Sequence, residues 1–356
     1  MRTAVGNSVP WSVSRPGHRV GIELAAYVLL AALLELAAGV GLAYVAGFGA
    51  VRAALASPDW VWLAAVCGFL AVSCVGYYYA YRAIFTVCDG PRLSRAQLRA
   101  VTAVGFGGFL AYWGGKIDRL ALEAAGASPA EARSRAGALA GLEQGTLAIG
   151  GCATAIAVLA AGSSIPASFT VPWAVIPVPG FLVAFWAAKR YRQRFGKHPG
   201  WRGLAGTFLE SVYLIRELVV RPRLWAWGWL GMALFWAADS CAVWAGLAAF
   251  GYEMNGAALF VGFATGMLFT RRTGPLAGAG VLTLVLSVTI WICGAPLPVA
   301  VAGVFAYRVL AFWVPMPVSL VALPALRRLV ACRIEGQPED ALQSARHGPH
   351  GMPQRG

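Results

Sequence analysis

The sequence predicts an all-α, polytopic integral membrane helix bundle, with about six full spans and two broken, re-entrant helices. Of its 356 residues, 59% are hydrophobic and only 12% are charged, whereas soluble domains usually carry about 25% charged residues. A water-soluble core of this size cannot bury so much apolar surface. The apolar residues also fall in runs of roughly 20 or more, the length at which a helix crosses about 30 Å of hydrocarbon.

Six runs meet this length inside a transmembrane domain that we place at 21–330. We expect the polar segment 1–20 not to be a cleavable signal peptide, because the apolar run after it is too long. The polar composition of 331–356 predicts a disordered cytoplasmic tail. The six expected spans cover about 24–48, 60–81, 136–161, 168–188, 224–250 and 299–326.

The apolar stretch 100–115 is the first of two that do not fit a simple span. It is short, contains Gly107 and Gly108, and is followed by Lys116 and Asp118. Broken helical backbone at membrane depth must be shielded from lipid by protein or must line a wet cavity. We therefore expect a re-entrant element here.

The second such stretch, 257–293, is too long for one span. Arg271, Arg272 and the segment GPLAGAG interrupt it near its middle. We expect a second re-entrant break with backbone that lines a cavity, and close helix packing through its glycines is the alternative. The expected loop positions are Gly274, Pro275, Gly278 and Gly280.

The basic residues orient the chain, because cytoplasmic loops of membrane proteins carry an excess of Lys and Arg. We place the N-terminus inside and let each broken stretch leave on the side it entered. Of the 29 Lys and Arg residues, only Arg52 then lies in an outside loop, and Arg271, Arg272 and Arg308 lie at membrane depth. This topology makes both termini cytoplasmic and the two broken stretches oppositely oriented.

A weak internal repeat connects the segments that follow the two breaks. Four positions recur at a constant offset of 168 residues: Gly126, Ala127, Ala132 and Ala138 match Gly294, Ala295, Ala300 and Ala306. Many transporters build a binding site at the membrane midplane from opposed broken helices near a repeat interface. Chance similarity in an alanine-rich chain is the alternative.

The segment 201–222 predicts an amphipathic helix. Its apolar residues recur at spacings of three and four, while its charged residues lie mostly off this stripe. Such a helix lies on the cytoplasmic membrane surface or packs against other helices. The stripe consists of Trp201, Leu204, Phe208, Val212, Ile215 and Val219.

Ionisable side chains inside the expected spans indicate a site. Each costs about 2.5–3.5 kcal/mol at a helix centre, so it persists where it faces a partner, the bundle interior or water. Adjacent Arg271 and Arg272 suit a lipid phosphate, which arginine binds through two hydrogen bonds. An ion-pair cluster with Glu143 and Asp239 is the alternative.

Three further basic residues and one acidic residue complete the expected site. Arg308 lies inside the last span and is expected to pair with Glu143 or Asp239. Lys116 and Arg119 offer a second anion-binding point, with ordinary cytoplasmic charge as the alternative. Glu35, like Glu143 and Asp239, is expected to balance the charge of the arginines inside the membrane.

Catalytic and metal-binding motifs are missing from the sequence. No P-loop, G-x-S-x-G or H-E-x-x-H motif occurs, and all four histidines lie in polar segments. We therefore expect no catalytic residue, metal or cofactor. A net charge of +14 indicates nucleic acid binding in some soluble proteins, but here it is better explained by topology and by attraction to anionic lipid.

Four sequence blocks resemble a known family. Pro-Leu-x-Gly-x-Gly is followed by Tyr-Arg and Trp-x-Pro, as in the flippase-like transmembrane region of lysylphosphatidylglycerol synthases. The similarity runs through most of 24–330. The blocks are GFGGFLAYWGGKIDRLALEAAGASPAEARSRAGALAGLE at 105–143, MALFWAADSCAVWAGLAAFG at 232–251, GFATGMLFTRRTGPLAGAG at 262–280 and GAPLPVAVAGVFAYRVLAFWVP at 294–315.

The resemblance implies a stand-alone member without the family's cytosolic aminoacyltransferase domain, located in the bacterial cytoplasmic membrane. It implies translocation or other handling of a lipid rather than aminoacylation. The residues that match the family's second broken motif are Arg271, Arg272, Gly278, Gly280, Tyr307 and Arg308, and those that match the first are Asp118 and Glu143.

These observations lead us to expect a flippase-like protein that binds and translocates a lipid with an anionic or phosphate-bearing head group. Two alternatives stay open. The first is the membrane component of a lipid-modifying or polyprenyl-phosphate-dependent transferase system with a separate enzyme as partner. The second is a non-transporting membrane scaffold. The sequence does not indicate an oligomeric state.

Overall fold

The computed structural model describes residues 18–106, 114–195, 201–268 and 278–313, with isolated positions up to 324, and every regular element in these ranges is a helix. Five helical segments are long and apolar enough to cross a membrane, and they match the first five expected spans. They are Leu29–Ala46, Trp60–Asp89, Pro129–Ala160, Ala167–Phe195 and Pro222–Ala248. The sixth expected span, 299–326, is described as a continuous helix only as far as Trp313.

Two long helices pack against each other along much of their length. Helices α3 (Trp60–Thr86) and α10 (Pro222–Ala248) share the most extensive contact between any two elements. A Cβ atom at Gly76 would lie 2.5 Å from the Gly231 carbonyl oxygen, and one at Gly231 would lie 2.6 Å from the Gly76 carbonyl oxygen. The two backbones therefore touch directly, as small residues permit in membrane helix pairs.

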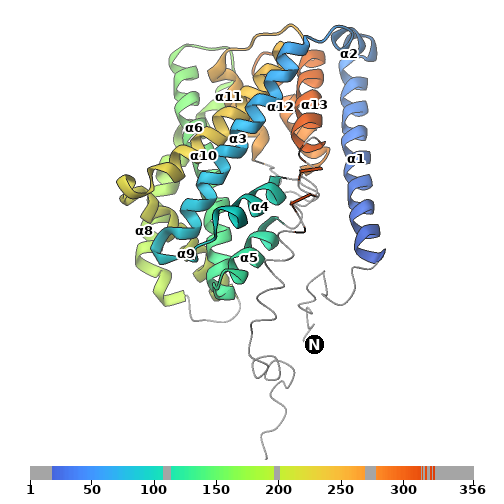
Figure 1. Cartoon of the computed structure of the whole chain (residues 1–356). Coiled ribbons are helices and arrows are strands. Elements are labelled where there is room, and N and C mark those ends of the chain that lie inside the picture. Colours follow the sequence, from blue (N-terminus) through green and yellow to red (C-terminus); the bar gives the residue numbers. More distant parts are fainter. Residues whose placement is uncertain are drawn as a thin grey trace, which may run out of the picture.

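The other long helices lie behind and beside this pair (Figure 1). Helix α1 (His18–Ala46) stands at one edge of the bundle, and the short α2 (Phe48–Leu55) follows it. Helix α6 (Pro129–Ala160) packs against α7 (Ala167–Val175) and α8 (Pro177–Phe195), which together make one apolar segment with Pro172 inside it. The division falls at Ile176, directly before Pro177, which has no backbone N–H to continue the hydrogen bonds of α7.

The structure describes a helix on each side of both expected breaks. These are α4 (Arg95–Phe106) and α5 (Gly114–Ala124) for the first, and α11 (Gly256–Met267) and α12 (Val281–Ile292) for the second. Gly278 and Gly280 have φ values of 70° and 76°, so the second break ends in left-handed backbone that favours glycine. The predicted loop positions Gly107, Gly108, Gly274 and Pro275 lie outside the described residues.

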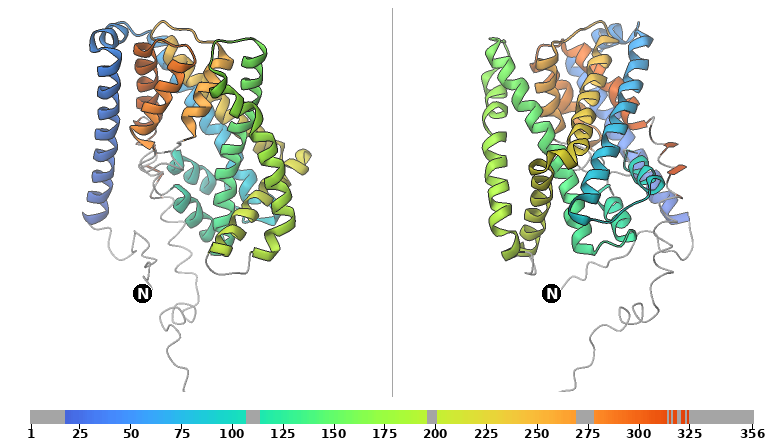
Figure 2. Two further views of the ribbon diagram at one scale, coloured as in Figure 1. Left: turned by 180° about the vertical axis from the view of Figure 1, so that it is seen from behind. Right: turned by 60° about the vertical axis from the view of Figure 1, so that its left-hand side comes forward.

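The two broken hairpins lie toward opposite ends of the bundle. In Figures 1 and 2, α4 and α5 occupy the half into which α8 and α9 extend, whereas α11 and α12 occupy the other half together with α13 (Leu297–Trp313). Each hairpin joins a long helix to a final helix. The N-terminal unit is α3–α4–α5–α6, and the C-terminal unit is α10–α11–α12–α13.

The turns after the hairpins are built alike. Gly126 and Gly294 have φ values of 103° and 116°. The Ala127 N–H donates to the Leu122 carbonyl at 3.0 Å, and the Ala295 N–H donates to the Ile290 carbonyl at 3.3 Å. Both are helix C-caps with a glycine in positive φ. Helices α6 and α10 end in the same cap, at Gly162 and Gly251, so the cap does not distinguish an internal repeat from chance similarity.

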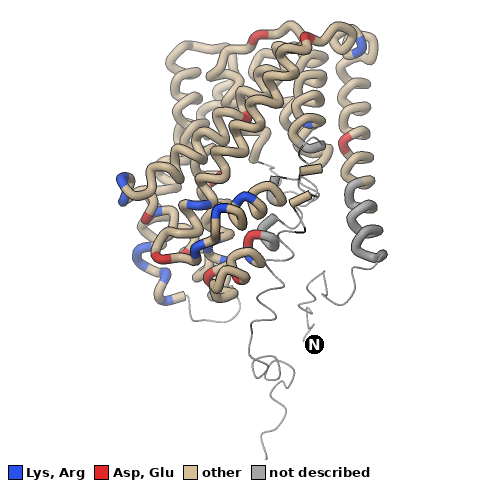
Figure 3. The backbone as a smooth tube through the Cα atoms, viewed as in Figure 1, with Lys and Arg blue, Asp and Glu red and all other residues tan. Residues whose placement is uncertain are grey.

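The predicted amphipathic helix is present as α9 (Trp201–Val220), but its apolar stripe is divided. Val212 and Ile215 are buried where α9 packs against α6 and α8, whereas Trp201, Leu204 and Phe208 are exposed. The packed alternative therefore applies to the middle of the helix, since Val219 near its end is also exposed. Figure 3 shows that Lys and Arg gather in the half of the bundle that holds α4, α5 and the ends of α8 and α9.

Candidate functional site

Four of the buried carboxylates bind side-chain hydroxyls of other helices. Glu35, Asp118, Glu143 and Asp239 lie on α1, α5, α6 and α10, and each is less than a tenth exposed. Burying a charge is costly unless hydrogen bonds or an opposite charge compensate for the lost water. Each of the four accepts a hydrogen bond from a side-chain hydroxyl.

Helix α3 supplies two of these hydroxyls. The Tyr77 hydroxyl donates to Glu143 Oε2 at 2.8 Å, and the Tyr81 hydroxyl, one turn later, donates to Asp118 Oδ1. The two tyrosine rings meet edge to face with centroids 5.0 Å apart. The indole N–H of Trp236 on α10 donates to the backbone carbonyl of Glu143 at 2.7 Å. Helices α3, α5, α6 and α10 are thereby joined by polar contacts at their buried faces.

The C-terminal unit contains the same kind of bond with the partners exchanged. The Tyr307 hydroxyl on α13 donates to Asp239 Oδ2 on α10 at 2.9 Å. In the N-terminal unit the tyrosine is on the first helix and the acid on the last, whereas here the acid is on the first helix and the tyrosine on the last. A tyrosine–carboxylate bond therefore joins the first and last helices of each unit.

Glu35 of α1 binds the first residues of α12, directly after the second break. The Gly280 N–H donates to Glu35 Oε2 at 2.8 Å, and the Thr283 hydroxyl donates to Glu35 Oε1. Arg308 Nε lies 3.4 Å from Glu35 Oε1, with the two side chains only 7% and 8% exposed. A carboxylate at a helix N-terminus is also favoured by the helix dipole.

The structure pairs Arg308 with Glu35, to which the sequence assigned only a general charge-balancing role. This contact forms because α1 packs against α12 and α13. Glu143 and Asp239 accept hydrogen bonds from Tyr77 and Tyr307, and the expected pairing of Arg308 with one of them stays a prediction.

The other predicted anion-binding residues are only partly described. Arg271 and Arg272 lie outside the described residues. Lys116 belongs to α5, but the position of its side chain is likewise outside the described part. Arg119 is half-buried on the same helix. The predicted second anion-binding point therefore stays a prediction.

Sequence reasoning missed a buried arginine at the end of α3. Arg135 on α6 is 3% exposed, and its Nη1 donates to the carbonyls of Ile84, Phe85 and Val87 at 2.9, 3.2 and 2.8 Å. Its Nε also binds Glu131 at 2.9 Å. An arginine that satisfies the last carbonyls of another helix fixes where that helix ends. The spacing of Glu131 and Arg135 indicates an ion pair but gives no sign of burial.

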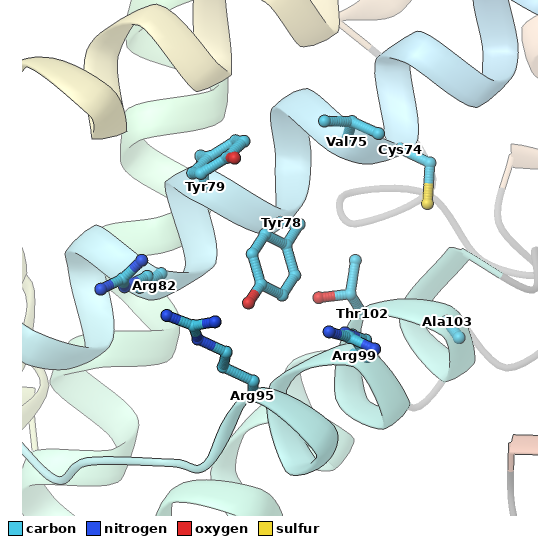
Figure 4. Close-up of a pocket in the computed structure, with 9 residues that line it drawn as sticks. All are labelled: Cys74, Val75, Tyr78, Tyr79, Arg82, Arg95, Arg99, Thr102 and Ala103. Atoms are coloured by element: carbon cyan, nitrogen blue, oxygen red, sulfur yellow. The ribbon is translucent and has the colours of Figure 1, made fainter.

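It also missed a cavity between α3 and α4. Arg82, Arg95 and Arg99 line a space of about 570 Å³ together with Tyr78, Tyr79 and Thr102 (Figure 4). The sequence prediction used these arginines only as cytoplasmic charges that set the topology. Their spacing carried a signal, because Tyr78 and Arg82, and likewise Arg95 and Arg99, are four residues apart and share a helix face.

Within the described ranges, no group of three or more His, Cys, Asp or Glu side chains is arranged to hold a metal ion.

Comparison with known proteins does not identify a family. The chain matches no protein-family model and no curated protein. The expected resemblance to the flippase-like region of lysylphosphatidylglycerol synthases therefore rests on the quoted sequence blocks alone.

Proposed function

We propose that this chain is a flippase-like protein of the bacterial cytoplasmic membrane that moves an anionic or phosphate-bearing lipid between the two leaflets. The observation that carries the proposal is that the second helix of each hairpin, α5 or α12, either contains or binds a buried carboxylate. Asp118 is in the first two turns of α5, and Glu35 binds the start of α12. The hairpins approach from opposite ends of the bundle.

This arrangement supports transport because a broken helix leaves backbone N–H and C=O groups without hydrogen bonds inside the membrane. Backbone groups freed by a break need partners, so natural proteins keep such breaks where they face protein or a wet cavity. Opposed breaks in an internal repeat are a common way to build a substrate site that opens to either side in turn. In the proposed topology both hairpins are re-entrant, six helices span the membrane, and both termini are cytoplasmic.

Arg308 is the proposed binding group for the lipid phosphate in the interior. Glu35 balances its charge when no lipid is bound, and an entering phosphate replaces that carboxylate as the partner of the guanidinium. Arginine suits this exchange because its planar group pairs with carboxylate and phosphate in similar geometry. Since no nucleotide-binding motif is present, lipid movement is driven by an ion gradient or by the lipid's own concentration difference.

Reconstitution in liposomes tests the proposal. Fluorescent phosphatidylglycerol is placed in both leaflets, and the fraction that an outside reductant bleaches is followed over time. We expect the purified protein to make inner-leaflet lipid accessible and Arg308→Gln to slow this at least about tenfold, as loss of a charge-assisted hydrogen bond implies. Arg133→Gln, an exposed site on the same chain, serves as the charge-matched control. Equal rates for Arg308→Gln and the control would remove the assigned role of Arg308.

A further inference from the structure

The cavity between α3 and α4 is cationic at one end. The guanidinium groups of Arg82 and Arg95 and the Tyr78 hydroxyl point toward one another, and Arg99 lies beside Thr102 (Figure 4). Among the residues that the structure describes, no Asp or Glu lines the cavity. Within the described ranges, none of the three arginines forms an ion pair with a carboxylate. Three guanidiniums without a counter-charge repel one another, and an anion between them removes that cost.

The other end of the cavity is apolar. Cys74, Val75 and Ala103 line it, and Val75 is 52% exposed. Cys74 and Arg82 are eight residues apart on α3, which corresponds to about 12 Å along a helix. Tyr78 and Tyr79 lie between the two ends. The lining therefore changes from apolar through aromatic to cationic along a helix that is apolar enough to span a membrane.

We propose that this cavity binds the phosphate group of an anionic phospholipid. Arg82, Arg95 and Arg99 hold the phosphate oxygens, the Tyr78 hydroxyl adds a donor, and the first carbons of an acyl chain lie along Val75 and Ala103. A free phosphate or a nucleotide would use only the cationic end. The order of apolar, aromatic and cationic side chains instead matches a lipid whose head group lies at the membrane surface.

The site is separate from the interior residues to which transport is assigned. None of Glu35, Asp239 and Arg308 lines the cavity. The cavity lies where basic residues gather, which is the cytoplasmic side in the proposed topology. A lipid held there is drawn from the cytoplasmic leaflet. The inference stands without translocation, because a resident lipid can bind this surface in a protein that moves none.

Native mass spectrometry of the purified full-length protein tests the site. Phosphatidylglycerol, phosphatidylcholine with the same acyl chains, and inorganic phosphate are titrated separately, and bound molecules are counted. We expect phosphatidylglycerol to bind most tightly and Arg95→Gln/Arg99→Gln to weaken it by about tenfold or more, as loss of two charge-assisted hydrogen bonds implies. The control Arg92→Gln/Arg133→Gln removes the same charge at exposed positions outside the cavity and is expected to bind as the parent does.

Three results would overturn the proposal. Equal affinity of the cavity variant and its control would show that only net charge attracts the lipid. Equal affinity for phosphatidylcholine would remove the assigned head-group preference. Inorganic phosphate that competes at the concentration of the lipid would indicate a plain anion site. If the protein transports lipid but the cavity variant binds phosphatidylglycerol as its control does, only the cavity proposal is contradicted. If the cavity binds lipid as expected but the protein transports none, only the transport proposal is contradicted.

A second measurement uses the unmodified protein, so it does not depend on how a variant folds. Phosphatidylglycerol with a photoreactive group near the glycerol is crosslinked in nanodiscs, and the labelled peptides are sequenced. We expect labels on 74–82 and 99–103 at higher yield than on the exposed apolar residues of α9. Labels spread evenly over all exposed apolar helices would contradict a specific site.

Discussion

The Arg308 guanidinium and the Glu35 carboxylate form a buried ion pair that joins α13 to α1, with Nε and Oε1 3.4 Å apart. Removal of one partner from such a pair leaves an uncompensated charge and typically costs about 3–5 kcal/mol. We therefore expect Arg308→Gln and Glu35→Gln each to lower the free energy of unfolding by that amount. The double variant Glu35→Gln/Arg308→Gln should lose less than the sum of the two.

Denaturant titration of the three variants in a mild detergent checks this coupling. The double-mutant cycle isolates the interaction, because each single change leaves the other charge in place. Losses that add fully in the double variant would show that Glu35 and Arg308 do not stabilise each other. Glu35 also accepts hydrogen bonds from the Gly280 N–H and the Thr283 hydroxyl, so Glu35→Gln should be the more harmful single change.

The repeated tyrosine–carboxylate bonds make a second prediction. Tyr77→Phe and Tyr307→Phe each remove one hydroxyl from a buried acid and keep the ring. Each should cost about 1–3 kcal/mol, the usual penalty for a buried polar group that loses its partner. Tyr79→Phe, at an exposed position of α3, is the control and should change stability by less than about 0.5 kcal/mol. Thermal unfolding of the three variants, followed by circular dichroism, compares them, and a shift with Tyr79→Phe as large as with Tyr77→Phe would refute the assignment.

Features that depend on local sequence were predictable, and those that depend on packing were not. Length and apolar composition located five of the spans, and clustered glycines located the second break, where Gly278 and Gly280 have positive φ. The contacts of Glu35 with Arg308 and Gly280 could not be predicted, because they join α1 to helices near the other end of the sequence, and Glu35 and Gly280 alone are 245 residues apart. The division of the α9 stripe was missed for a similar reason, since only contact with α6 and α8 decides which apolar residues are covered.

Gly280 gives a third prediction. Its φ of 76° disfavours any side chain, and an added Cβ would lie 2.6 Å from the Leu34 carbonyl oxygen of α1. Gly280→Ala should therefore cost at least about 1–2 kcal/mol and separate α1 from the start of α12. Gly41→Ala, in the same helix as Leu34 but with open space around it, should stabilise by about 0.5–1 kcal/mol. The two changes in the free energy of unfolding should therefore have opposite signs. An unchanged stability of Gly280→Ala would contradict the close approach of Gly280 to the Leu34 carbonyl.

Arg135 gives the last prediction, because it connects the end of α3 to the start of α6. Its Nη1 donates to the carbonyls of Ile84, Phe85 and Val87, and the chain continues from there to α4 and its cavity arginines. Arg135→Lys keeps the charge but loses the planar fork that contacts several oxygens at once. We expect faster amide hydrogen exchange across 84–95, where the freed helix end opens locally.

The same change, Arg135→Lys, also tests whether the end of α3 influences lipid binding in the cavity. Because Arg95 and Arg99 follow the segment that Arg135 holds, Arg135→Lys should weaken phosphatidylglycerol binding in the cavity, although Arg135 does not line it. Arg133→Gln, two residues away and exposed, should leave both exchange and binding as they are. Unchanged exchange at 84–95 in Arg135→Lys would mean that the helix end is fixed by other contacts. Faster exchange with unchanged binding would mean that α4 is positioned by its packing on α3 rather than by the chain between them.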